Sequence, residues 1–303
     1  MHESTCGCGL HSRRLFTGLL VGSVTAGAFA PAAWAQQNNA ADEGVRRDVG
    51  KESKFTRLAP ADQIEAAAAQ QYQQMLRKAA EQRALAPDNH PQLVRLRYIA
   101  QRLVPHALAW NERAKQWRWE VNLLGSKDLN AFCMPGGKIA FYYGLLAQLQ
   151  LSDDEVATIM GHEIAHALRE HARERIGKNI ATRAGASIVS SLLGLGNLGD
   201  AALGAGAQLL TLKNSREDES EADIVGMDLA ARAGYDPKAG VTLWQKMMSA
   251  SKGAPPQFLS THPAGATRIR DIEAKLPKVE PLYARAAKPD RRFGPPAASA
   301  NAP

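Results

Sequence analysis

His162 and His166 stand four residues apart, and Glu163 directly follows the first of them. If this stretch is helical, both imidazoles lie on one face about a turn apart, where they can bind the same Zn²⁺ at about 2.0–2.1 Å. Glu163 is then placed to take a proton from a metal-bound water. This spacing predicts a zinc site with His162 and His166 as ligands and Glu163 as general base.

The residues around this motif predict the helix that it needs. Ser152 followed by Glu155 matches a capping box, and acidic residues in the first turn suit the helix dipole. Apolar residues recur at helical spacing from Val156 to Leu168, so one side is expected to be buried, and no proline interrupts 152–176. The alternative is an amphipathic helix that carries two histidines by chance. A third ligand would distinguish the two, because catalytic zinc normally has three protein ligands.

An acidic cluster further along the chain offers that third ligand. Five carboxylates fall between Glu217 and Asp223, directly before an apolar helical pattern that begins at Ile224. Such a cluster is typical of the solvated first turn of a helix, which explains most of its members. One glutamate can instead face inward to the metal. Asp223 lies four residues after Glu219, on the same face, and can hydrogen-bond a ligand histidine and fix its tautomer.

These motifs resemble a family of integral-membrane and periplasmic zinc metallopeptidases that includes HtpX, the CaaX prenyl endopeptidase and the mitochondrial protease Oma. The segment Glu-Ser-Glu-Ala-Asp at 219–223 matches that family's second motif, and the resemblance implies that Glu219 is the third zinc ligand. Residues 130–137 and 260–263, with Arg268, resemble the soluble bacterial envelope branch typified by BepA and LoiP. Over about residues 90–275, the resemblance implies a gluzincin-type peptidase with one Zn²⁺ per chain.

The pattern of elements predicts a mainly α fold with a small antiparallel β-sheet, an α+β class. Residues 117–123 alternate apolar and polar side chains, which is typical of a strand. Two further runs, 131–134 and 138–143, flank Pro135-Gly136-Gly137 and predict a hairpin. The edge strand of such a sheet can bind an extended peptide by strand addition. We therefore expect substrate-binding residues at Ala131, Phe132, Cys133, Met134, Gly136 and Gly137; a sheet with only a structural role is the alternative.

Three residues near these motifs need separate interpretation. A lone histidine before proline, as His262 is, is commonly structural or exposed. The resemblance implies instead a catalytic-site role: His262 either reaches the zinc as a fourth ligand and keeps the enzyme latent, or stabilises the oxyanion of the tetrahedral intermediate. Arg268 is expected either to orient this loop or an acidic neighbour, or to lie exposed on a helix. His171 follows His166 by five residues, about 100° off its face, which predicts a non-ligand.

The first 35 residues are predicted to be a twin-arginine signal peptide. Arg13 and Arg14 precede an apolar stretch at 15–33, and Ala33-Trp34-Ala35 offers a cleavage site. A membrane anchor is the alternative, but the stretch is rich in Gly, Ala, Ser and Thr, which disfavours a spanning helix. Cleavage would leave Cys133 as the only cysteine, so no internal disulfide is expected.

The remaining sequence divides into three parts. Residues 36–60 are polar and expected to be a flexible linker, 61–276 a metallopeptidase domain, and 277–303 a disordered tail rich in proline, alanine and basic residues. Residues 188–212 are apolar and glycine-rich, and predict a helical hairpin between the zinc helices. This hairpin is expected to be part of the core; a lid, or a surface for a membrane or partner, is the alternative.

These observations predict a zinc-dependent endopeptidase of the bacterial cell envelope that degrades misfolded or unassembled proteins. Its expected partners are unassembled envelope proteins and the outer-membrane assembly machinery. The formal net charge of +7 is spread along the chain, which suits attraction to an anionic membrane surface rather than nucleic-acid recognition. The alternative function is a zinc-dependent chaperone or assembly factor with a silent peptidase site. The expected location is the periplasm, peripheral to a membrane.

Overall fold

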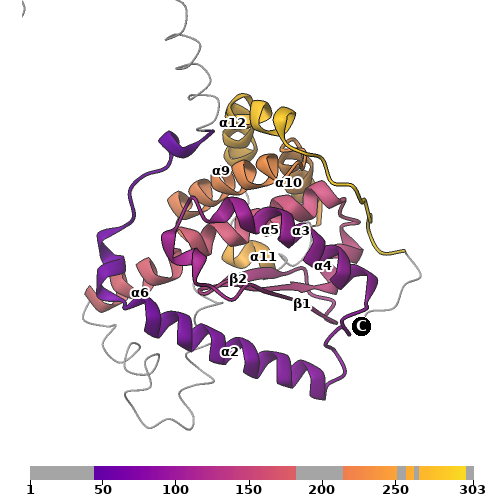
Figure 1. Ribbon diagram of the computed structural model, residues 1–303, viewed down its shortest axis with the longest axis horizontal. Helices are drawn as coiled ribbons and strands as arrows, with labels where there is room; N and C mark the ends of the chain where they lie inside the picture. Colours follow the sequence, from indigo (N-terminus) through magenta and orange to yellow (C-terminus); the bar gives the residue numbers. More distant parts are fainter. Residues whose placement is uncertain (1–43, 182–213, 251–256, 263–265, 298–303) are drawn as a thin grey trace, which may run out of the picture. The chain divides into compact units, whose positions relative to one another are not determined.

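The computed structural model describes residues 44–181, 214–250, 257–262 and 266–297. The predicted signal peptide and the predicted hairpin at 188–212 lie outside these ranges. The described part of the chain is mainly helical, with one small sheet (Figure 1). Its elements are η1 (Arg46–Asp48), η2 (Lys54–Leu58), α2 (Ala61–Glu81), α3 (Pro91–Ala107), η3 (Glu112–Lys115), β1 (Glu120–Leu124), β2 (Ala131–Met134), β3 (Lys138–Tyr142), α4 (Tyr143–Gln148), α5 (Asp153–Leu168), α6 (His171–Ala181), α9 (Arg216–Arg232), α10 (Ala239–Ala250), α11 (Gln257–Thr261) and α12 (Ala266–Arg285).

The three strands are arranged in the order β1-β3-β2. β2 and β3 form the predicted antiparallel hairpin, with Phe132 opposite Ala140. β1 pairs with β3 in parallel, with Val121 opposite Ile139, so the sheet is mixed rather than purely antiparallel. The chain reverses once after β1 and again after β2. Because β3 then takes the central position beside β1, the two reversals give these neighbours the same direction.

The hairpin turn depends on its glycines. Gly136 and Gly137 have φ angles of 83° and 76°, in the left-handed region that disfavours other residues. A Cβ on Gly137 would also lie 2.8 Å from the ring of Trp119. The turn therefore fixes where β2 ends, and it leaves β2 at an edge of the sheet.

The sheet lies between two helical layers (Figure 1). Alternate side chains point to opposite faces of each strand, so Phe132 and Met134 join a core with α2, whereas Val121, Leu123 and Phe141 join the larger core with α3 and α5. No helix in the described part of the chain combines the length and apolar character needed to cross a membrane.

α5 and α9 make the closest helix contact near the site, and glycine permits it. A Cβ on Gly161 of α5 would lie 2.7 Å from the carbonyl oxygen of Gly226 on α9. A Cβ on Gly226 would lie 2.7 Å from the backbone nitrogen of His162. Any larger residue at either position would separate the two helices, which carry the predicted ligands.

The segment before α2 packs against the domain from residue 44 onward, which corrects the expectation of a flexible linker up to residue 60. Val45 is fully buried, and the described part of the segment lies partly against α6. Arg173 of α6 donates hydrogen bonds of 2.8 Å to the carbonyl oxygens of both Ala59 and Thr56. Buried backbone acceptors and one apolar anchor thus hold a polar segment in place.

The expectation of a disordered tail from residue 277 is wrong up to residue 297. α12 continues through Pro277 and Pro281 to Arg285. Val279 and Leu282 are buried in the larger core, and this burial offsets the backbone hydrogen bonds that the prolines cannot make. Beyond the helix, the backbone nitrogen of Phe293 donates to Asp153 at 2.8 Å. Composition alone therefore misjudged a segment that long-range packing orders.

Candidate active site

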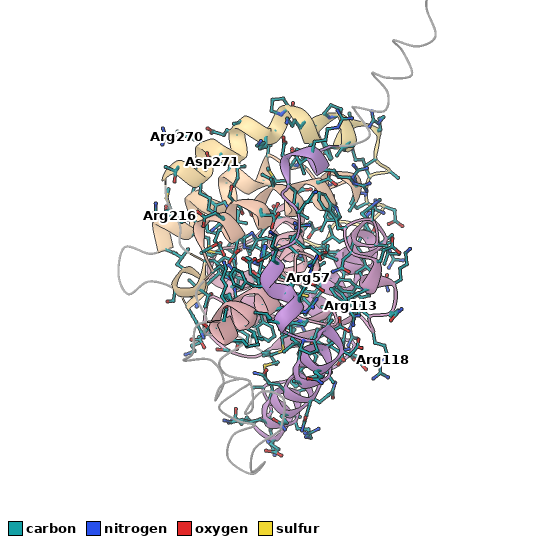
Figure 2. All side chains as sticks on the ribbon, turned by 90° about the vertical axis from the view of Figure 1, so that its left-hand side faces the viewer. Arg57, Arg113, Arg118, Arg216, Arg270 and Asp271 are labelled. Carbon is teal, nitrogen blue, oxygen red and sulfur yellow. The ribbon has the colours of Figure 1, made fainter. Side chains whose placement is uncertain are left out.

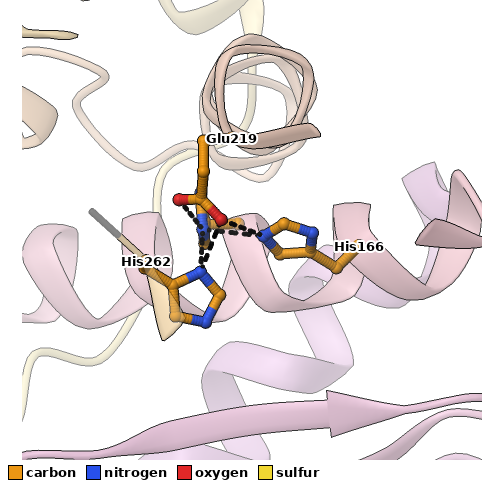
Figure 3. Close-up of side chains that lie close together, drawn as sticks. His166, Glu219 and His262 are labelled. Atoms are coloured by element: carbon orange, nitrogen blue, oxygen red, sulfur yellow. Dashed lines mark hydrogen bonds and ion pairs between the residues drawn. The ribbon is translucent and has the colours of Figure 1, made fainter. Parts of the chain in front are cut away.

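Four buried side chains converge on one point, each with a potential ligand atom within 4.8 Å of the other three: His162, His166, Glu219 and His262. Figure 3 shows His166, Glu219 and His262 directed toward one another. Nε2 of His162 lies 3.0 Å from Nε2 of His166 and 3.2 Å from Nδ1 of His262. Oε1 of Glu219 lies 3.3 Å from Nε2 of His166 and 2.9 Å from Nδ1 of His262. Ligands of a tetrahedral zinc at about 2.0–2.1 Å are about 3.3 Å apart, so these donors fit that ion in type and spacing.

α5 presents two of these ligands. Its predicted capping box is present: the Glu155 nitrogen donates to Oγ of Ser152 at 3.2 Å, and the Ser152 nitrogen donates to Oε2 of Glu155 at 2.8 Å. His162 and His166 share a face, with ring centroids 4.6 Å apart. Every residue from Val156 to Leu168 is buried, whereas the sequence predicted one buried side, because the sheet and α9 cover different sides of the helix.

α9 sorts the acidic cluster into separate roles. Asp218 caps the helix, since its Oδ2 accepts from the Ser215 nitrogen at 3.0 Å. Glu217 is exposed, as expected for a solvated first turn. Glu219 points to the predicted metal site, where the four side chains converge. Burial raises the pKa of Glu219, but His262 and His166 outweigh this effect and hold the pKa below its ordinary value. Glu219 therefore stays ionised, as a metal ligand must be.

Asp223 and Arg268 support His162, as the sequence predicted for the aspartate. Nδ1 of His162 lies 3.0 Å from Oδ1 of Asp223. Nε of Arg268 donates to Oδ2 of Asp223 at 2.5 Å, and its Nη1 lies 2.6 Å from Oε2 of Glu219. The guanidinium stacks 3.6 Å above the ring of Trp244. Burial raises the pKa of Asp223, but Arg268 and His162 outweigh it and hold the pKa below its ordinary value. Of the two expected positions for Arg268, the structure shows the one beside an acidic neighbour.

A second support, behind His166, was not predicted. Nδ1 of His166 lies 2.8 Å from Nδ1 of His171, and Nε2 of His171 lies 2.9 Å from Oε2 of Glu221. If Nε2 of His166 binds metal, its Nδ1–H donates to His171, whose Nε2–H donates to Glu221. Glu221 also pairs with Arg169 at 3.0 Å. Burial holds the pKa of His166 well below its ordinary value, so the ring is neutral and able to ligate.

The end of α5 explains why spacing missed this contact. The estimate of 100° assumed that the helix continues, but α5 ends at Leu168 and Glu170 has a φ of 57°. This left-handed residue turns the chain, so that His171 returns toward His166. His171, predicted to be a non-ligand, contributes no atom to the group of converging ligand atoms among the described residues. Glutamate is a residue type that favours helices, so the sequence carried no signal for this turn.

Glu163 lies beside the predicted metal site, and one of its carboxylate oxygens lacks a hydrogen-bond partner among the described residues. Its Oε1 is shielded from solvent and accepts no hydrogen bond from the residues that the structure describes; Nε2 of His262 lies 3.5 Å away. Burial raises the pKa of Glu163, although His262 and His162 oppose this. The backbone of Cys133 hydrogen-bonds to the same carboxylate. A buried acceptor with a raised pKa is suited to exchange a proton with a water that lies between it and the predicted metal site.

The predicted edge strand lines a cleft at this site. Ala131, Phe132, Cys133 and Met134 all border the cleft, as do Glu163, His166 and His262. Gly136 and Gly137 instead form the hairpin turn and are not among its lining residues. β2 is an edge strand, so a peptide in the cleft has one free backbone edge beside it.

Asn214 is a further residue that the sequence did not single out. Its Nδ2 donates to Oε1 of Glu219 at 2.7 Å and lies 3.2 Å from Nδ1 of His262. The backbone nitrogen of Asn214 donates to the carbonyl oxygen of Thr261 at 3.2 Å. Asn214 thus joins the start of α9 to the end of α11. An asparagine one residue before a helix cap carries no sequence signal for such a contact.

Comparison with known proteins agrees with this geometry. The model of peptidase family M48 matches residues 91–276. Mitochondrial metalloendopeptidase OMA1 of Arabidopsis thaliana is 40% identical over 152 residues, which is 50% of this chain and 30% of that protein. Metalloprotease LoiP of Escherichia coli (strain K12) is 30% identical over 194 residues, 63% of this chain and 73% of LoiP. The beta-barrel assembly-enhancing protease of the same strain is 27% identical over 202 residues, 63% of this chain and 40% of that protein.

The extent of these matches decides what they establish. The chain spans less than two thirds of the length of the OMA1 relatives, with 30%, 56% and 61% of three of them covered. The family match covers more than half of the chain and includes every converging ligand, and it confirms the resemblance seen in the sequence. The chain belongs to peptidase family M48.

Proposed function

We propose that this protein is a zinc-dependent endopeptidase in which His162, His166 and Glu219 hold one Zn²⁺ and Glu163 is the general base. The observation that best supports this is the convergence of buried donors beside the unpaired Oε1 of Glu163. When bound, the zinc polarises the scissile carbonyl and acidifies the attacking water.

The protein's own groups supply the remaining steps. Glu163 takes a proton from the attacking water and delivers it to the leaving amine. Asp223 and His171 hold the two ligand imidazoles in one tautomer. β2 aligns the substrate by strand addition along Ala131–Met134. Backbone hydrogen bonds of this kind give affinity with little dependence on sequence.

The experiment that tests this function replaces Glu163 by glutamine, which keeps the size of the side chain and removes the base. Peptide hydrolysis is expected to fall by about 10²–10⁴-fold, with zinc content unchanged by elemental analysis. Glu217→Gln, an exposed carboxylate on α9, serves as the control and is expected to keep full activity. Full activity of Glu163→Gln with zinc bound would refute the assigned base.

We further propose that His262 keeps the resting site latent. Its Nδ1 lies with the three proposed ligands, at 2.9 Å from Glu219 and 3.2 Å from His162, where it would take the fourth position on a bound zinc and exclude water. His262→Ala is expected to raise peptide hydrolysis. Lower hydrolysis would indicate oxyanion stabilisation instead, and an unchanged rate would rule out both roles.

For the biological role, we propose quality control in the bacterial envelope, after export by the twin-arginine signal, with unassembled envelope proteins as substrates. The bacterial relatives support this, one of them a beta-barrel assembly-enhancing protease, whereas the OMA1 relatives are mitochondrial. The second candidate is a chaperone or assembly factor, supported by the position of His262 beside the three proposed ligands. Glu163→Gln in cells separates the two: retained outer-membrane assembly favours the chaperone, and its loss favours the protease.

A further inference from the structure

Arg175 on α6 lines the catalytic cleft together with Glu163 and His166. Its Nε and Nη1 atoms are shielded from solvent, yet they have no hydrogen-bond partner in the described part of the chain. Buried guanidinium donors without partners lower stability, because water no longer satisfies them. Such a group requires an explanation, and the nearest one is a partner that arrives with the substrate.

The other charged side chains that line the cleft, apart from those at the predicted metal site, already have hydrogen-bond or ion-pair partners. Glu65 accepts hydrogen bonds from Nε of Arg113 at 2.9 Å and from Nε1 of Trp117 at 3.0 Å. Glu170 pairs with Arg173, which also binds backbone carbonyl oxygens. Arg175 is thus the unpaired charge among the described residues of this wall.

The carboxylates around Arg175 act on it only through space. Burial lowers the pKa of Arg175, and Asp218, Glu219, Glu174 and Glu163 oppose this. Asp218 caps α9, and Glu174 pairs with Lys178 at 2.7 Å. Glu219 and Glu163 belong to the metal site. Arginine remains protonated at any physiological pH, so the site keeps a positive charge with unused, directional donors.

We propose that Arg175 binds a carboxylate of the substrate, from an Asp or Glu side chain near the scissile bond or from the free C-terminus of a peptide. The planar guanidinium presents paired N–H donors that match a carboxylate. Arg175 gives a specificity that backbone pairing to β2 does not provide. This proposal rests on the endopeptidase function proposed above.

The test uses peptide pairs that differ only by Asp against Asn at each position from four residues before to four after the cleaved bond, each with a free or an amidated C-terminus. At one position, or at the C-terminus, the charged form is expected to have a kcat/KM about ten- to hundredfold higher. Arg175→Gln is expected to bring this ratio close to one, mainly through KM. Arg175→Lys keeps the charge and is expected to keep part of the ratio.

Arg118→Gln is the matched control, because Arg118 is exposed and is not among the residues that line the cleft. Its side chain extends outward from the domain (Figure 2). This change removes the same charge and is expected to leave the ratio as in the wild type. The thermal midpoint of Arg175→Gln is expected to equal or exceed that of the wild type, since an unpaired buried charge is removed. A clear fall in the midpoint with an unchanged ratio would show a structural role and overturn the proposal.

Binding of the same peptide pairs to zinc-loaded Glu163→Gln is measured by fluorescence anisotropy, which needs no turnover. Cleavage or binding without preference for the carboxylate overturns the role of Arg175 and leaves the endopeptidase function standing. Preferential binding that Arg175→Gln abolishes, with no cleavage by the wild type or His262→Ala, supports Arg175 and counts against the endopeptidase.

Discussion

The two proposed ligand histidines of α5 are supported in different ways. His162 touches a carboxylate directly, and that carboxylate, Asp223, is held by the buried Arg268. His166 reaches its carboxylate, Glu221, only through His171. The first support is buried on every side, with Asp223 6% exposed, whereas Glu221 is 21% exposed at the edge of the site. The site therefore has two supports of different kinds. We call Asp223 with Arg268 the deep support, and His171 with Glu221, which act through two hydrogen bonds in series, the outer support.

Because of this difference, folding stability is expected to depend more on one of the two supports than on the other. Arg268 contacts both Asp223 and Glu219, so the deep support joins a ligand to the group that orients another ligand. The outer support links the end of α5 to α9 and leaves the deep support untouched. Changes to the deep support should lower both folding stability and metal affinity, and changes to the outer one mainly metal affinity.

One change is expected to disturb both supports together. Gly226→Ala places a Cβ 2.7 Å from the His162 backbone nitrogen, which forces α9 away from α5 and moves Glu219, Glu221 and Asp223 together. The free energy of unfolding is expected to fall by about 1–3 kcal/mol, and the zinc dissociation constant to rise at least about tenfold. Urea titration and chelator competition measure the two.

Gly240→Ala is the matched control for this change. Gly240 is also a buried helical glycine, but the nearest atom to its Cβ would be Cγ2 of Ile272 at 3.5 Å, an ordinary contact. Alanine in a helix is favoured over glycine by about 0.5–1 kcal/mol, so stability is expected to stay or rise. Equal effects of the two changes would contradict a special close contact between α5 and α9.

Asp223→Ala tests the deep support alone. Arg268 keeps Glu219 but loses its other buried partner, so the free energy of unfolding is expected to fall by about 3 kcal/mol. His162 loses the acceptor that fixes its tautomer, and zinc affinity is expected to fall about 10–100-fold. Asp88→Ala, at a side chain 90% exposed and paired only with Arg97, should change stability by less than about 0.5 kcal/mol. Unchanged stability in Asp223→Ala would show that Arg268 needs no second partner.

The sequence predicted those features of the site that depend on residues close together in the chain, and it missed those that depend on contacts made only in the fold. The capping box at Ser152 and the pairing of His162 with His166 depend on residues within one helix, and both were found. The inward position of Asp223 followed from its spacing to Glu219 on α9. The contact between His166 and His171 depends on the left-handed Glu170, which no periodicity reveals.

Long-range contacts account for the other misses. The parallel pairing of β1 with β3 depends on which strand takes the central position, and the pattern of apolar residues is the same for either arrangement. The tail was judged by its prolines, yet Val279 and Leu282 bury it against helices far away in sequence. The open donors of Arg175 depend on which carboxylates are already committed elsewhere, which only the folded structure reveals.

The smallest effect is expected from Glu221→Gln in the outer support. Glutamine keeps an oxygen that accepts from His171 but loses the charge that pairs with Arg169. Zinc affinity is expected to fall by less than about tenfold, below the loss in Asp223→Ala. Glu217→Gln, an exposed member of the same acidic cluster, is expected to bind zinc like the wild type. A loss in Glu221→Gln as large as that in Asp223→Ala would end the distinction between the two supports.

Low pH removes the charge of Glu221, so a pH series distinguishes the effect of that charge on stability from the effect of side-chain shape. Burial disfavours the ionised form, but His171 and Arg169 outweigh it and hold the pKa of Glu221 below its ordinary value of 4.5. A carboxyl whose pKa is lowered by folding contributes stability above its unfolded pKa and loses it as the pH falls through the folded one. The difference in unfolding free energy between the metal-free wild type and Glu221→Gln should therefore be present at pH 7 and shrink below about pH 4.5. A difference that persists in acid would assign the effect to shape, because a protonated carboxyl and an amide are both neutral there.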